Sequence, residues 1–147
     1  MENNMMRKLL VVSASVLLLP TLMAQDSEHG FVRITPDEFD WTVRESGTAF
    51  VIIEGNPAEE GFYIQRNRFP PGNYSTPHYH DQDRYITVIS GTWYTATSAD
   101  AELDDMVALP AGSYMKHPAG GWHFDGTRDE EAIVEIRGMG PVKTVRE

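Results

Sequence analysis

Residues 72–91 read GNYSTPHYHDQDRYITVISG, and this stretch decides the fold of the chain. His78 and His80 stand two residues apart, and side chains at that spacing share one face when the backbone is extended. Pro77 fixes the backbone before the pair, and residues 85–89 are β-branched or aromatic, so the pattern favours a strand over a helix. Two neutral imidazoles on one face can donate to one cation, so the pair predicts a metal site.

The second informative stretch, residues 112–127, reads GSYMKHPAGGWHFDGT and contains a third histidine, His123. A turn at residues 118–121 precedes this histidine, and Trp122 stands directly beside it. Three imidazoles are enough to hold a metal while leaving coordination positions open for a ligand.

The spacing within the two stretches forms a pattern. The first runs Gly72, five residues, His78-x-His80, three residues, Arg84, six residues, Gly91, and the second runs Gly112, five residues, Pro118-x-Gly120, two residues, His123, three residues, Thr127. These stretches resemble the two cupin motifs in order. Residues 57–61, 68–72 and 138–141 also resemble a little-characterised group of small single-domain bacterial cupins.

The resemblance implies an all-β fold, a single-domain cupin jelly-roll β-barrel built as an antiparallel double sheet. It also implies a three-histidine site on His78, His80 and His123 for one divalent metal ion, which could be iron, zinc, manganese, nickel or copper. Small cupins commonly pair, so a homodimer is a further expectation. The family includes dioxygenases, isomerases, lyases and proteins that only bind ligands, and the fold does not choose among them.

The chain departs from the motifs at two positions. Arg84 stands where a glutamate ligand is usual, and Thr127 stands where asparagine is usual. If Arg84 keeps the face of His78 and His80, it points into the pocket, where at about 5 Å and an effective dielectric of about 20 it would repel a divalent ion by roughly 6 to 7 kcal/mol.

Three arrangements would relieve that repulsion. An anionic ligand can lie between the metal and the guanidinium, an acidic neighbour such as Asp81 or Asp83 can hold Arg84, or the arginine can swing outward. In the first arrangement Arg84 binds the substrate, because its fork matches two acceptor oxygens.

Aromatic residues are candidates to shape the mouth of such a pocket. Trp122 is the leading one, as a substrate-binding residue beside a ligand, and Tyr63, Tyr74 and Trp93 are alternatives that core packing would equally explain. His117, just before Pro118, fits either a general base or a rim residue, and the spacing does not decide between them.

The rest of the chain reads as short strands separated by turns. Five runs, one of which is the run 85–89 named above, carry strand signals and are bounded by Gly, Pro, Asn or Asp: 49–53, 62–69, 85–89, 92–97 and 132–137. No long amphipathic helical pattern competes with them, which favours a sandwich or barrel. Residues 35–38 predict one helical turn, and the acidic segment 98–105 predicts an exposed loop.

The N-terminus has the layout of a secretory signal peptide. Arg7 and Lys8 precede the apolar run 9–19, and a small residue, Ala24, marks the expected cleavage point. This run is well short of the roughly 20 residues that a membrane-spanning helix requires. We therefore expect residues 1–24 to be a signal peptide, residues 25–147 to be the cupin domain, and the mature protein to be periplasmic or secreted without a membrane span.

Composition excludes several classes of function. The full chain has 12 basic and 22 acidic residues and a net charge of −10, which argues against a nucleic-acid partner. It has no cysteine, so it has neither disulfides nor a thiol nucleophile. The sequence predicts an exported metal-dependent cupin, an enzyme of dioxygenase-like or other metal-assisted chemistry on a small anionic molecule. The alternatives are a cupin that binds a small molecule or metal without catalysis, and a structural cupin without metal.

Overall fold

The computed structural model describes residues 25–26 and 30–146. The chain divides into two compact units between Glu38 and Phe39. The described part of the first unit contains β1 (Gln25–Asp26) paired antiparallel with β2 (Phe31–Val32), followed by the 3-10 turn η1 (Pro36–Glu38). This turn confirms the helical turn expected at residues 35–38, and the predicted signal peptide lies outside the described residues. Within the described residues, no helix has the length and apolarity needed to span a membrane.

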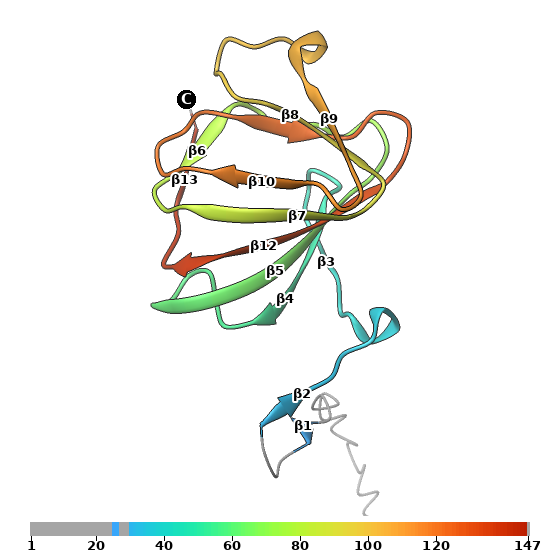
Figure 1. Ribbon diagram of the computed structural model, residues 1–147, viewed down its shortest axis with the longest axis vertical. Coiled ribbons are helices and arrows are strands. Elements are labelled where there is room, and N and C mark those ends of the chain that lie inside the picture. The colour runs from blue at the N-terminus through green and yellow to red at the C-terminus, as the bar shows by residue number, and fades with distance from the viewer. Residues whose placement is uncertain (1–24, 27–29, 147) are drawn as a thin grey trace, which may run out of the picture. The chain divides into compact units, whose positions relative to one another are not determined.

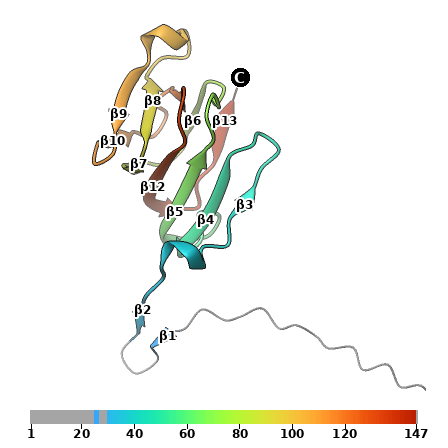
Figure 2. The same ribbon diagram turned by 90° about the vertical axis from the view of Figure 1, so that its right-hand side faces the viewer.

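The second unit contains a six-stranded antiparallel sheet with the order β10-β7-β12-β5-β4-β3 (Figure 1). Its long central strands, β5 (Gly61–Phe69) and β12 (Ala132–Gly140), pair along their whole length. The outer strands are β3 (Thr42–Val43), β4 (Ala49–Glu54), β7 (Arg84–Ser90) and β10 (Tyr114–His117). Figure 2 shows β12, β5, β4 and β3 side by side.

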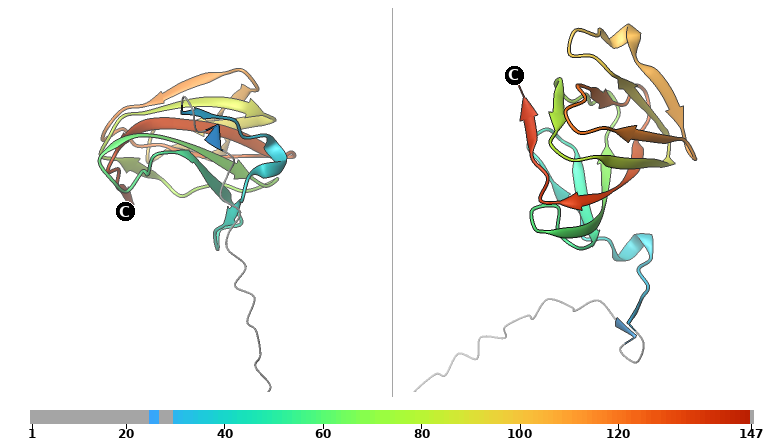
Figure 3. Two further views of the ribbon diagram at one scale, coloured as in Figure 1. Left: turned by 90° about the horizontal axis from the view of Figure 1, so that it is seen from below. Right: turned by 60° about the vertical axis from the view of Figure 1, so that its left-hand side comes forward.

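The opposite layer consists of two small sheets that meet at the histidines. One has the order β11-β8-β9, and the other pairs β13 with β6. Their bounds are β6 (His78–His80), β8 (Thr92–Ala96), β9 (Val107–Pro110), β11 (Phe124–Gly126) and β13 (Thr144–Arg146). An antiparallel bridge between His78 and His123 joins the two, and the C-terminal strand β13 lies beside β6 (Figure 3).

The core lies between the layers because alternate residues of each strand point inward. On β7, Ile86 is 1% exposed and Val88 is buried, whereas Ile89 is 41% exposed. Ile136 of β12 stands opposite Ile86, and the indole of Trp93 packs in the same cluster. The double sheet is therefore closed by apolar side chains from both layers.

The turn between β7 and β8 requires glycine. Gly91 has a φ of +68°, and a Cβ built there would lie 2.1 Å from the carbonyl oxygen of Glu131. Any other residue would clash with the neighbouring backbone and adopt a costly left-handed conformation. This tight turn sends the chain from one sheet into the other.

All five strand runs named above are confirmed as β4, β5, β7, β8 and β12. The prediction of a plain loop at 98–105 was wrong in one detail, because η2 (Leu103–Asp105) forms a 3-10 turn there. The backbone amide of Glu102 donates to Oδ2 of Asp105 at 2.9 Å, which stabilises this turn.

Candidate metal centre

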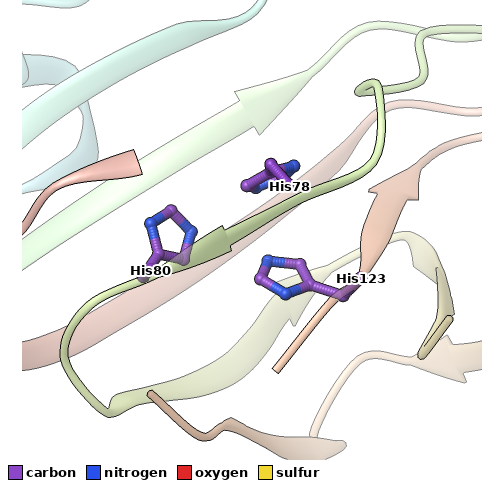
Figure 4. Close-up of side chains that lie close together, drawn as sticks. All are labelled: His78, His80 and His123. Carbon is purple, nitrogen blue, oxygen red and sulfur yellow. The ribbon is translucent and has the colours of Figure 1, made fainter. Parts of the chain in front are cut away.

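Backbone pairing brings the three predicted histidines together. His78 and His80 face inward from β6, and their ring centroids lie 5.0 Å apart. His123 lies opposite His78 on the neighbouring segment, where the two residues exchange N–H···O bonds of 2.9 Å. The His123 centroid is 4.4 Å from that of His78 and 5.3 Å from that of His80. Figure 4 shows the three rings gathered between the two strands.

Hydrogen bonds set the orientation of two of these rings. Nδ1 of His78 lies 2.8 Å from the carbonyl oxygen of Thr76, and Nδ1 of His123 lies 2.8 Å from that of Gly121. A carbonyl can only accept, so each Nδ1 carries the proton and each Nε2 keeps a free lone pair. Nε2 of His123 is buried and has no partner among the described residues.

The donor set fits a divalent metal ion. One nitrogen from each of the three histidines lies within 4.8 Å of the others, as atoms that share an ion must. Burial lowers the pKa of His123 to about 4, to which the nearby charges of His78 and Arg84 add. Burial also lowers the pKa of His80 to about 2. The rings of His80 and His123 are therefore neutral at pH 7, which is the form that binds metals.

Arg84 points into the pocket, as its position in the strand predicted. It lines the central cavity, and its Nη1 donates to Nε2 of His80. The two acidic neighbours are engaged elsewhere: Asp83 pairs with Lys116 at 2.6 Å, and Asp81 accepts from the amide of Lys143 at 2.7 Å. Neither the outward swing nor capture by these acids occurs.

The Arg84 contact has a consequence for metal binding at His80. Thr144 Oγ1 lies 3.1 Å from Nδ1 of His80, so both ring nitrogens already have partners. Nε2 has one lone pair, and a cation and a guanidinium cannot both use it. A metal held by this nitrogen requires Arg84 to move away from it.

Two further residues join the cluster, and sequence reasoning did not assign either. His117 is buried, with its ring centroid 3.6 Å from that of His123, and both its ring nitrogens lack partners among the described residues. Asp125 is also buried, and it forms with His117 and His123 a second group of donor atoms within 4.8 Å. Of the two alternatives left open for His117, its burial disfavours a rim residue.

Of these two residues, Asp125 could have been found from the sequence, whereas His117 could not. Asp125 follows His123 by two residues, so it shares the inward face of that segment. His117 pairs directly with Arg84 across β10 and β7. The first signal is visible in the sequence, whereas the second depends on strand pairing that the spacing does not specify.

The cluster opens into a cavity of about 490 Å³ between the two layers, a size typical of small-ligand sites. Three of the aromatic candidates, Tyr63, Tyr74 and Trp93, line it. Trp122 is not among the lining residues, and its ring packs edge to face on Tyr79 with centroids 5.0 Å apart. Substrate binding by Trp122 stays a prediction that the position of its ring does not support.

Comparison with known proteins identifies the fold through structure alone. No protein-family model matches the chain, and no curated protein matches it. Among solved structures, the chain is similar to the polyketide cyclase RemF from Streptomyces resistomycificus, with 18% identity, a TM-score of 0.64, and coverage of 80% of this chain and 87% of that one.

Two other solved structures carry the family name. An RmlC-like cupin from Shewanella frigidimarina has 14% identity and a TM-score of 0.61, over 80% of this chain and 96% of that one. A sugar phosphate isomerase from a cupin superfamily, from Silicibacter pomeroyi, has 18% identity and a TM-score of 0.58, over 78% and 82%. The sheet order and these neighbours show that this chain has an all-β cupin fold, an antiparallel double-sheet jelly roll.

Proposed function

We propose that this protein is an exported metal-dependent enzyme that acts on a small anionic molecule, with His78, His80 and His123 as metal ligands. The observation that carries the proposal is the convergence of three buried imidazoles at the edge of a cavity lined by arginine. Three protein ligands leave coordination positions open, which distinguishes a reactive or ligand-binding metal site from a structural one.

The residues around the metal position have distinct tasks in this proposal. A bound divalent ion would act as a Lewis acid on an oxygen of the substrate. Arg84 would bind and orient the anionic group of the substrate, because a guanidinium presents parallel donors to two oxygens. The aromatic residues Tyr63 and Trp93 line the same cavity and would help to exclude water.

The fold does not determine the reaction, since the fold neighbours include both a polyketide cyclase and a sugar phosphate isomerase. The reaction class must therefore be determined by experiment. A dioxygenase is our first candidate. The three-histidine site resembles those of iron-dependent cupin dioxygenases, which take anionic, chelating substrates. For an exported protein, zinc and copper are rivals of iron, because nitrogen-rich sites bind them more tightly than ferrous iron or manganese.

The proposal is tested on the purified mature protein in two steps. Elemental analysis should find close to one metal ion per chain, and oxygen uptake or product formation should then be measured with β-diketones, catechols and 2-oxo acids. Turnover that is lost in His123→Ala supports an enzyme. Stoichiometric metal with ligand binding but no turnover supports a binding protein, and a folded protein that takes up no metal contradicts the proposal.

A further inference from the structure

The charge of the cavity is opposite to that of the chain. The chain carries a net charge of −10, with 22 acidic and 12 basic residues. Nevertheless, three arginines line the cavity, Arg44, Arg84 and Arg146, and the only carboxylate among the lining residues is Asp125. One carboxylate can offset one guanidinium at most, so the cavity has an excess of positive charge.

The three arginines reach the cavity at different depths. Arg84 lies on β7 next to the histidines, and its Nε is shielded from solvent without a partner among the described residues. Arg44, in the turn after β3, and Arg146, at the end of β13, are both exposed residues. The cavity therefore has one cationic group at its inner end and two near solvent.

The cavity arginines differ from several other cations, though not from all, in how they are paired. Arg66 and Arg137 form ion pairs with Glu135 at 3.0 and 2.8 Å, and Lys116 pairs with Asp83. Among residues 30–146, no ion pair with a carboxylate is formed by Arg44, Arg84 or Arg146. Arginines that share one concave site without a carboxylate partner are typical of recognition sites for anions.

The outer pair, Arg44 and Arg146, is held in position without an ion pair to a carboxylate. The guanidinium carbon of Arg44 lies 4.1 Å from the centroid of Phe50, and the backbone amide of Arg44 donates to Thr48 at 2.8 Å. Burial and then the charge of Arg84 lower the pKa of Arg44, so the two guanidinium groups lie close enough to repel. On β13, Arg146 pairs in register with the metal-site residue His78.

We propose that the cavity binds a small dianion, with one anionic group at Arg84 beside the metal position and the second at Arg44 and Arg146. This inference rests on the proposed function and extends it, because it requires a second anionic group at the far end of the ligand. The second subsite makes the protein selective for dicarboxylates over monocarboxylates of the same length.

The test compares matched 2-oxo acids by isothermal titration calorimetry on the metal-loaded mature protein at fixed ionic strength. Monocarboxylic and dicarboxylic 2-oxo acids with four, five and six carbons form three pairs that differ only in the second carboxylate. We expect at least one dicarboxylate to bind tenfold or more tightly than its partner. Arg44→Met and Arg146→Met should each weaken this dicarboxylate several-fold and leave the monocarboxylate unchanged.

The controls separate this inference from the function on which it rests. Arg128→Met removes an exposed arginine that does not line the cavity and should change neither affinity. If monocarboxylates bind through Arg84 but no dicarboxylate is preferred, or if the preference survives in the Arg44→Met/Arg146→Met double variant, the second subsite is refuted alone. If neither class binds to the metal-loaded protein, the proposed function fails as well.

Discussion

Arg84 donates a hydrogen bond from Nη1 to Nε2 of His80, the nitrogen that a metal ion at the three-histidine site would use. In the sequence, Arg84 stands where the cupin motif that this stretch resembles has a glutamate ligand. A cation and Arg84 therefore compete for one lone pair, and they also repel each other. A metal ion bound at Nε2 of His80 would displace the Arg84 guanidinium from that nitrogen, which frees its donors for an anionic ligand in the cavity.

Replacing Arg84 should consequently strengthen metal binding. In Arg84→Gln the competition and the repulsion are both removed, and we expect metal affinity to rise about tenfold or more, since even about 1.4 kcal/mol of relieved repulsion corresponds to that factor. Arg84→Glu adds a carboxylate ligand and should bind metal more tightly still. Competition with a chromophoric chelator measures both, and affinities equal to that of the unmodified protein would show that Arg84 does not oppose the ion.

Anion binding should change in the opposite direction in the same variants. Arg84→Gln and Arg84→Glu lose the inner cationic group, so a 2-oxo monocarboxylate should bind at least tenfold more weakly, with the greater loss in Arg84→Glu. Calorimetry on metal-loaded samples checks this expectation. Unchanged affinity in Arg84→Glu would mean that Arg84 does not bind the anion.

The metal-free protein should lose stability as the pH falls. Burial lowers the pKa of His80 and His117 to about 2 and that of His123 to about 4, whereas an unfolded histidine has a pKa near 6.5. Below pH 6.5 the unfolded state therefore binds more protons than the native state, and each such histidine costs up to about 1.4 kcal/mol per pH unit. Urea unfolding in a chelator between pH 7 and pH 4 measures this slope.

One substitution tests whether the buried histidines cause this dependence of stability on pH. His117→Leu removes a histidine whose ring nitrogens have no described partner, so the variant should be at least as stable at pH 7 and should show a shallower decline toward pH 4. A slope identical to that of the unmodified protein would contradict the view that His117 is buried in its neutral form.

The sheet register predicts a contrast between two isoleucines on one strand. Ile86 faces the core and is 1% exposed, so Ile86→Ala should cost about 2 to 5 kcal/mol in the free energy of unfolding. Ile89 is 41% exposed, and Ile89→Ala should cost about 1 kcal/mol or less. Chemical denaturation measures both, and similar losses would place β7 in another register.

Much of the barrel could be predicted because its signals are local. Alternation along residues 85–89 and 132–137 and the turn at Gly91 reflect constraints within a few residues, and the structure confirms these strands. Short edge strands such as β9 and β13 could not be predicted, because pairing with neighbours rather than their own composition makes them extended.

From the residues alone, the direction of a site residue could be predicted only where alternation of side chains along one strand determines it. His78, His80 and Arg84 share a face, and His123 was identified through its motif. His117, Arg44 and Arg146 reach the cavity through pairing between distant segments, such as Arg146 opposite His78 and His117 opposite Arg84. Such contacts depend on the closed double sheet, and no spacing in the sequence specifies them.

The most direct test of the central claim is X-ray absorption spectroscopy on the mature protein loaded with one equivalent of zinc. The account predicts about three imidazole nitrogens at roughly 2.0 to 2.1 Å with the remaining positions filled by oxygen ligands. In His123→Ala the metal should be lost, whereas Tyr79→Phe, which alters a residue between the two β6 histidines, should retain it. A zinc ion without histidine ligands, or one retained unchanged in His123→Ala, would contradict the account.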